Sequence, residues 1–137
     1  DPEVERSLLP GDGGPPPDPA TLTPAFEPEV LSALWRAVDE VRLAPEVGDY
    51  LHAIVQATRE DGAFETGVST RGLLLFGRAA RARALVLGRP YVSPEDVHAL
   101  AVPVCAHRVV PRGLDRVPRE EAEARLRGLV ERIPAPT

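Results

Sequence analysis

The chain contains no lysine, although it is well supplied with basic residues. All 16 of its lysine-plus-arginine positions are arginine. A Walker A loop needs a lysine that reaches the β- and γ-phosphates of a nucleotide, and the sequence contains no match to that motif. These 137 residues alone therefore cannot form a complete P-loop NTPase, although they are compatible with one part of such an enzyme.

Methionine is also absent, even from position 1, and the chain opens on Asp1 and Pro2. This start indicates a piece of a longer polypeptide rather than a complete gene product. The length suits one small domain with tails, since domains commonly contain about 100 to 150 residues.

Disulfides, long apolar runs and a positive net charge are missing too. With Cys105 as the only cysteine, the chain can form no internal disulfide. No segment resembles a secretory signal or a membrane-spanning helix, so we expect a cytoplasmic protein without membrane contact. The net charge of −5 disfavours nucleic acid as a partner, because duplex binding draws on many phosphate contacts.

The first 24 residues are rich in proline and glycine. Pro15, Pro16 and Pro17 are consecutive, a composition that excludes a helix or a central strand. We interpret residues 1–24 as a linker. Its apolar residues either dock on a neighbouring domain or belong to a solvated tail; they are Val4, Leu8 and Leu9.

Helices are predicted after this linker, because apolar residues recur at intervals of three and four and strand-like runs are lacking. They are expected over residues 27–41, 45–61, 69–88, 93–103 and 118–133. The predicted fold class is therefore all-α. A small bundle of four to five helices would span residues 25–108, followed by a linker and an amphipathic helix over residues 109–137.

Two apolar features suggest where the core lies. The segment 69–88 is apolar nearly all round, which is typical of a helix enclosed by others, so we expect it at the centre of the bundle. Trp35, the only tryptophan, lies on the apolar stripe of the first helix and is expected to anchor the core.

The run Gly67-Val68-Ser69-Thr70-Arg71 opens the central helix with an arginine in its first turn. Ser69 is the expected N-cap, because its hydroxyl can accept a hydrogen bond from a first-turn N–H. A helix start carries a partial positive charge, so a cation there is unfavourable unless an anion also binds. Exposed N–H groups and a guanidinium that converge on one point form a phosphate-binding arrangement; the plain alternative is a surface arginine.

Other candidate sites are weaker. Cys105, His107 and His98 lack further ligands at tetrahedral spacing, so no metal site is predicted. Instead, His107 and Arg108 are expected to bond the last carbonyls of the fourth helix. Ser93 and Pro94 mark the start of that helix. Acidic residues such as Glu95 and Asp96, together with Asp39, Glu40, Glu60 and Asp61, are explained as caps and solvated faces rather than as a catalytic pair.

Taken together, these segments resemble the C-terminal lid of MoxR-type AAA+ ATPases. The similarity lies in residues 67–71, 78–82, 88–97 and 107–108, and it extends upstream through residues 57–59 and 47–50. It covers roughly residues 23–108. In that family the lid is a small helical bundle that follows the α/β nucleotide-binding core.

The resemblance implies a role for the arginine that opens the third helix. Arg71 would be the catalytic sensor 2 residue that contacts the γ-phosphate of ATP, with Gly67, Ser69 and Thr70 beside the nucleotide. The family often has proline before this arginine, where the chain has Thr70. ATP with Mg²⁺ would be held mainly by a core domain outside this chain.

Partners are implied in the same way. They are the chain's own AAA+ core, neighbouring ring subunits and a von Willebrand factor A domain protein, in a chaperone-like remodelling machine. Three other interpretations stay open: the related lid of a magnesium-chelatase ATPase subunit, a histone-like or scaffold module, and a protein-interaction bundle. Acidity and the lack of lysine weigh against a DNA-binding histone-like module.

Overall fold

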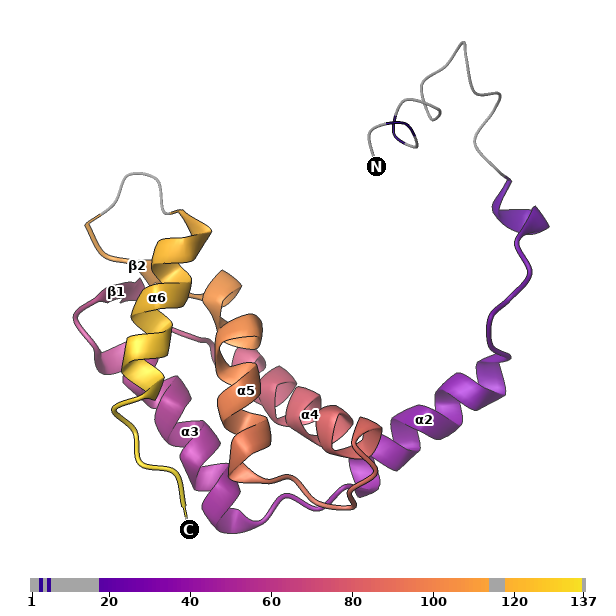
Figure 1. Ribbon diagram of the computed structural model, residues 1–137, viewed down its shortest axis with the longest axis horizontal. Coiled ribbons are helices and arrows are strands. Elements are labelled where there is room, and N and C mark those ends of the chain that lie inside the picture. Colours follow the sequence, from indigo (N-terminus) through magenta and orange to yellow (C-terminus); the bar gives the residue numbers. More distant parts are fainter. Residues whose placement is uncertain (1–2, 4, 6–17, 114–117, 137) are drawn as a thin grey trace. The chain divides into compact units, whose positions relative to one another are not determined.

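The structure is a computed structural model that describes residues 3, 5, 18–113 and 118–136. Its helical elements, shown in Figure 1, are η1 Pro19–Thr21, α2 Pro28–Glu40, α3 Pro45–Glu60, α4 Thr70–Val86, α5 Pro94–Cys105, η2 Ala106–Arg108 and α6 Arg119–Val130. Two short strands, β1 Phe64–Thr66 and β2 Val110–Pro111, complete the set. The predicted all-α class is confirmed. Most of the predicted linker, with Val4, Leu8 and Leu9, lies outside the described residues.

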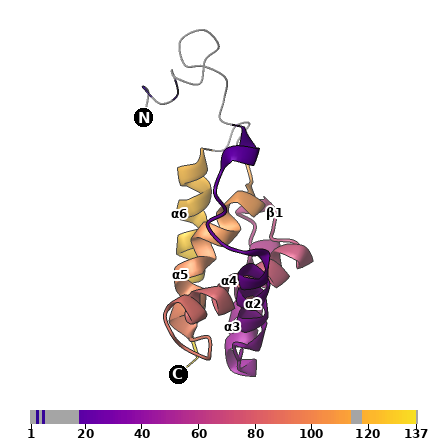
Figure 2. The same cartoon turned by 90° about the vertical axis from the view of Figure 1, so that its right-hand side faces the viewer.

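The chain divides into two compact units, residues 1–32 and 33–137. Within the second unit, α5 packs against α3, α4 and α6, and Figures 1 and 2 both show it between α4 and α6. The segment after Arg108 completes this bundle, because α6 packs on α5 and α3 through four buried residues: Ala122, Leu126, Leu129 and Val130. The predicted domain boundaries after residues 24 and 108 stay predictions.

The helices begin where local signals predict. Pro45 is the first residue of α3, Ser69 is the N-cap of α4, and Ser93 with Pro94 opens α5. Gly88 ends the α4 turn at φ +71°, a conformation that residues with a side chain rarely adopt. Pro103 does not end α5, which continues to Cys105.

The central helix is less enclosed than its composition suggests. α4 buries a single stripe at four-residue spacing: Gly72, Phe76, Ala80 and Ala84. Leu74 and Val86 on its other faces are 69% and 85% exposed. The prediction of a helix surrounded on all sides is therefore wrong, because the neighbouring helices cover only one side of α4.

Trp35 does not anchor the core. Its side chain is 56% exposed, and α2 contains no buried residue. The apolar stripe of α2 is real, but no described part of the chain covers it. The prediction of a core tryptophan is therefore wrong, because a stripe shows which face of a helix is apolar and not what packs against it.

The segment between α3 and α4 includes a strand, although the sequence shows no strand-like run there. β1 pairs antiparallel with β2, with Phe64 opposite Pro111 and Thr66 opposite Val110. Phe64 is buried, and the Arg112 N–H donates to the carbonyl of Ala63 at 2.8 Å. This small sheet fastens the segment that leads into α4. Every helix of the described residues is too short or too polar to cross a bilayer.

Candidate functional site

Ser69 caps α4 as predicted. Its backbone is extended (φ −70°, ψ 167°), and its hydroxyl oxygen accepts a hydrogen bond from the Gly72 N–H at 3.2 Å. Helix geometry leaves the N–H groups of Thr70 and Arg71 without a partner inside the helix. The start of α4 therefore presents two free backbone donors.

Consecutive residues of α3 hold the segment that precedes the cap. The Val68 N–H donates to the Thr58 hydroxyl at 2.9 Å, and the Arg59 Nε donates to the Val68 carbonyl at 2.7 Å. Thr58 is itself buried and donates its hydroxyl proton to the Val55 carbonyl at 2.6 Å. The position of Arg71 is thus set by α3 as well as by its own helix.

Gly67 is required by this close packing. A Cβ atom at Gly67 would lie 2.6 Å from the Thr58 carbonyl oxygen and 2.7 Å from the Arg59 Cα, so any larger residue would push the two segments apart. This close packing is sufficient to explain why position 67 is a glycine, and no bound ligand is needed to explain it. Its contact with a nucleotide stays a prediction.

The Arg71 side chain is exposed and makes no hydrogen bond or ion pair with another described residue. Ser69 and Thr70 are exposed as well. The guanidinium therefore lies on the surface rather than in the bundle, where a group from outside can reach it.

Two further arginines lie close to the start of α4. Arg59 contacts Val68, and the Arg108 Cδ lies 3.5 Å from the position that a Cβ of Gly72 would occupy. Neither forms an ion pair with a described carboxylate. The Arg108 Nε donates to the carbonyl of Val104 at 3.1 Å, which confirms that it bonds the end of α5.

α4 differs from the other described α-helices in the charge of its first turn. The first turns of α2, α3, α5 and α6 all contain acidic residues, whereas that of α4 contains none and carries Arg71 instead. Acidic side chains stabilise a helix start by compensating its partial positive charge. Two free N–H groups and an unpaired guanidinium can bind an anion such as a phosphate there.

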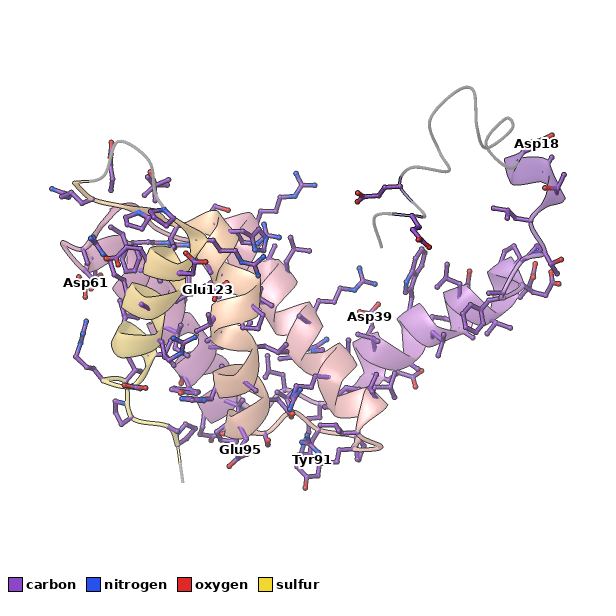
Figure 3. All side chains as sticks on the ribbon, turned by 45° about the horizontal axis from the view of Figure 1, so that its top comes forward. Asp18, Asp39, Asp61, Tyr91, Glu95 and Glu123 are labelled. Carbon is purple, nitrogen blue, oxygen red and sulfur yellow. The ribbon has the colours of Figure 1, made fainter. Side chains whose placement is uncertain are left out.

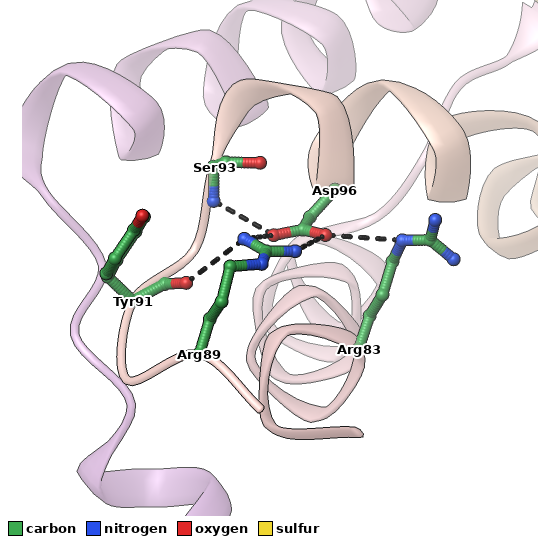
Figure 4. A network of polar contacts seen from close by, with 5 residues as sticks. All are labelled: Arg83, Arg89, Tyr91, Ser93 and Asp96. Carbon is green, nitrogen blue, oxygen red and sulfur yellow. Dashed lines mark hydrogen bonds and ion pairs between the residues drawn. The ribbon is translucent and has the colours of Figure 1, made fainter. Parts of the chain in front are cut away.

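A second charged cluster, at the start of α5, was not predicted (Figure 4). Asp96 is 1% exposed, and its carboxylate accepts hydrogen bonds from Arg89 at 2.8 and 2.6 Å and from the Ser93 N–H at 2.9 Å. The Arg83 Nε lies 3.2 Å from the same carboxylate. The cap role of Asp96 is confirmed, but its interpretation as a solvated residue is wrong.

The charges of this cluster compensate one another, because Arg83 and Arg89 both pair with Asp96. Burial acts to raise the pKa of the Asp96 carboxyl group, but the hydrogen bonds from Arg89 and Ser93 outweigh it, so the pKa lies below its ordinary value. Asp96 is therefore ionised, and it joins the end of α4 to the start of α5. The sequence hints at it only through the two arginines that flank the Gly88 turn.

The residues considered for a metal site do not come together. Among the described residues, no group of three or more His, Cys, Asp or Glu side chains could hold a metal ion. Cys105 is buried, and burial raises the pKa of its thiol to about 12 although the Arg108 charge acts to lower it. The thiol is therefore protonated and unreactive.

Comparison with known sequences assigns this chain to a family. The model of the AAA lid domain matches residues 56–129. The chain is 34% identical over 116 residues to the uncharacterized protein YeaC of Bacillus subtilis, which covers 85% of this chain and 36% of YeaC. It is 37% identical over 114 residues to the protein MoxR of Methylorubrum extorquens, covering 82% of this chain and 31% of that protein.

A shorter sequence match and a match to a solved structure point to the same family. The protein MoxR of Paracoccus denitrificans is 54% identical over 43 residues, which cover 31% of this chain and 13% of that protein. A crystal structure of a candidate ATPase from Cytophaga hutchinsonii superposes with a TM-score of 0.56 at 27% identity, covering 72% of this chain and 31% of the other. The chain thus spans about a third of the length of its longer-matching relatives. It belongs to the AAA lid domain family, and the resemblance to the lid of MoxR-type AAA+ ATPases is confirmed.

Proposed function

We propose that this chain is the lid of a MoxR-type AAA+ ATPase and that Arg71 is its sensor 2 arginine. One observation carries the proposal: Arg71 stands in the first turn of α4, exposed, without an internal partner and without a nearby acidic residue of that turn. The two MoxR relatives favour this assignment over a magnesium-chelatase lid and over a histone-like or purely interacting module. A cytoplasmic location is part of the same proposal.

The residues present suit one task in ATP hydrolysis. The Arg71 guanidinium would contact the γ-phosphate and stabilise the charge that develops on it, helped by the N–H groups of Thr70 and Arg71. No carboxylate in the first turn of α4 is available for Mg²⁺, so the metal and most of the nucleotide would be held by a core domain outside these residues. That domain supplies the phosphoryl-transfer chemistry.

The same contact would report the state of the nucleotide. Once the γ-phosphate is lost, the guanidinium loses its anion, and the lid is free to move relative to the core. Movement of this kind in ring subunits, with a von Willebrand factor A domain partner, would remodel other proteins. Those assemblies belong to the proposal through the resemblance alone.

The test is Arg71→Ala in the full-length protein that contains this lid. Steady-state ATP turnover should fall about tenfold or more, the cost of losing a charge contact in the transition state. The thermal unfolding midpoint should not change, since the Arg71 side chain is exposed and makes no hydrogen bond or ion pair with a described residue. Arg127→Ala is the matched control, because Arg127 is an exposed arginine of α6 without an ion pair to a described residue. An unchanged turnover in Arg71→Ala refutes the sensor 2 assignment.

A further inference from the structure

The last turn of α3 is fixed to the rest of the bundle. α3 ends at Glu60, and its C-cap is Asp61, which Figure 3 labels. The Asp61 carboxylate accepts a hydrogen bond from the Ala63 N–H at 2.8 Å and pairs with Arg132, which follows α6, at 2.6 Å. Thr58, in the same turn, is 1% exposed. A segment that binds to this turn is therefore held in place by the bundle as a whole.

Arg59 lies in this turn and directs its side chain to neutral acceptors. It is exposed, its Nε donates to the Val68 carbonyl at 2.7 Å, and its Nη1 donates to the Gln56 Oε1 atom at 3.3 Å. No ion pair joins it to a carboxylate of the described residues. The side chain thus connects the end of α3 to Val68, the residue that precedes the N-cap of α4.

The Val68 carbonyl depends on this donor. Val68 is 0% exposed, and within the described part of the chain the Arg59 Nε is the donor to its carbonyl. A buried carbonyl that loses its donor carries the full cost of desolvation, which a shift of the chain toward water relieves. The Val68 N–H is held separately by the buried Thr58 hydroxyl. Loss of the Arg59 donor should therefore shift the segment without unfolding the bundle.

A shift of Val68 would reach Arg71, which lies three residues further along the chain. The residue before an N-cap helps to fix the angle at which the chain enters the helix, and Arg71 stands in the first turn of that helix. A displacement of about 1 Å is enough to weaken a contact in a transition state. A small change at Val68 would thus withdraw the guanidinium from a phosphate although the Arg71 side chain itself is intact.

We propose that Arg59 is a positioning residue in ATP hydrolysis. Its hydrogen bond to the Val68 carbonyl sets the direction of Arg71, and its charge is not required for this effect. The inference rests on the proposed function, because the effect of Arg59 on turnover passes through the sensor 2 arginine. The Arg59 guanidinium itself does not touch the nucleotide.

Two substitutions of similar length in the full-length protein separate the hydrogen bond from the charge. Arg59→Gln loses the charge but places an amide nitrogen as many bonds from the Cα as the arginine Nε, whereas Arg59→Met has no donor. We expect kcat for ATP hydrolysis to fall about fivefold in Arg59→Met, with KM for ATP changed less than about twofold, because the core holds most of the nucleotide. Arg59→Gln should retain more than about half of the wild-type kcat, since it restores the donor.

Arg127→Met is the matched control for these variants. Arg127 is an exposed arginine of α6 without an ion pair to a described residue, so its replacement should leave kcat at the wild-type value. Wild-type turnover in Arg59→Met would overturn the proposal. An equal fall in Arg59→Gln and Arg59→Met would overturn it as well, because the charge would then be the active feature and Arg59 would meet the nucleotide directly.

A double-mutant cycle shows whether the effect passes through Arg71. Once Arg71→Ala has removed the guanidinium, Arg59 has nothing left to position, so adding Arg59→Met should lower turnover by less than about 1.5-fold. A loss caused by a smaller folded fraction would be equally large in both backgrounds. That result would overturn the positioning role.

The inference and the proposed function fail in different ways. If Arg71→Ala leaves turnover unchanged, the sensor 2 assignment is refuted, and the positioning role with it. If Arg71→Ala lowers turnover and Arg59→Met does not, the sensor 2 assignment stands and the positioning role alone is refuted.

Discussion

The starts of α4 and α5 use the same kind of cap and differ in charge. Ser69 and Ser93 are the N-cap residues of the two helices. At α5 the helix supplies its own anion, Asp96, which two arginines then neutralise. At α4 no acid is present, and Arg71 remains without a partner among the described residues.

The difference separates a helix start that the bundle neutralises from one that it does not, and under the proposed function the second is the start that meets the nucleotide. A positive helix end combined with an unpaired cation is locally unfavourable, and such conflicts concentrate at functional sites. The charge at the α5 start is neutralised by Arg83 and Arg89 of the bundle, so this start should contribute to the free energy of unfolding. Under the proposed function the α4 start should govern the response to nucleotide, which Arg71→Ala tests. The following substitutions test how much each helix start contributes to stability.

Asp96→Asn should have the largest effect on stability. It removes the charge that holds Arg83 and Arg89, so we expect the free energy of unfolding to fall by about 3 kcal/mol, the low end for breaking a buried pair because both arginines retain some solvent contact. Urea denaturation measures the change.

Glu120→Gln is the control for that experiment, because Glu120 is an acidic residue of the first turn of α6 that is exposed. It should change stability by less than about 0.5 kcal/mol. If the two variants lose the same amount, the cluster at the start of α5 has no special role in stability.

Gly67→Ala should have the next largest effect. The added methyl group would meet the backbone of α3, and we expect a loss of about 2 kcal/mol in unfolding free energy. Gly62→Ala is the control, because a Cβ there meets nothing within 4 Å. Wild-type stability in Gly67→Ala would show that the start of α4 is not held against α3 as described.

Acid should remove the difference between wild type and Asp96→Asn. The folded-state pKa of Asp96 lies below its ordinary value of 3.8, so its contribution to stability is present above that value and is lost as the pH falls through the folded-state pKa. The gap in unfolding free energy between wild type and Asp96→Asn should therefore close below about pH 4. A gap that stays constant down to pH 2 would contradict this account.

Local signals predicted the helix boundaries well. Proline, serine and glycine act on their own backbone and on the next turn, so Pro45, Ser69, Ser93 and Gly88 could be interpreted without knowledge of the fold. The position of Arg71 in the first turn of α4 followed from the same logic. Its exposure did not, because that depends on which helices pack around α4.

The features that sequence reasoning missed depend on distant contacts. Burial of Asp96 requires that Arg83 and Arg89 converge across a turn, and the β1–β2 pairing joins Phe64 to Pro111. Exposure of Trp35 has the opposite cause, since the apolar stripe of α2 was clear and no described part of the chain covers it. Periodicity identifies an apolar face but carries no information about its partner.

Two hydrogen bonds from α3 to the backbone of Val68 restrain the segment that carries Arg71. Because Thr58 and Arg59 hold Val68 at both its N–H and its carbonyl, displacing the start of α4 without α3 would break both hydrogen bonds. Under the proposed function, a phosphate that draws on Arg71 would therefore move α3 together with α4.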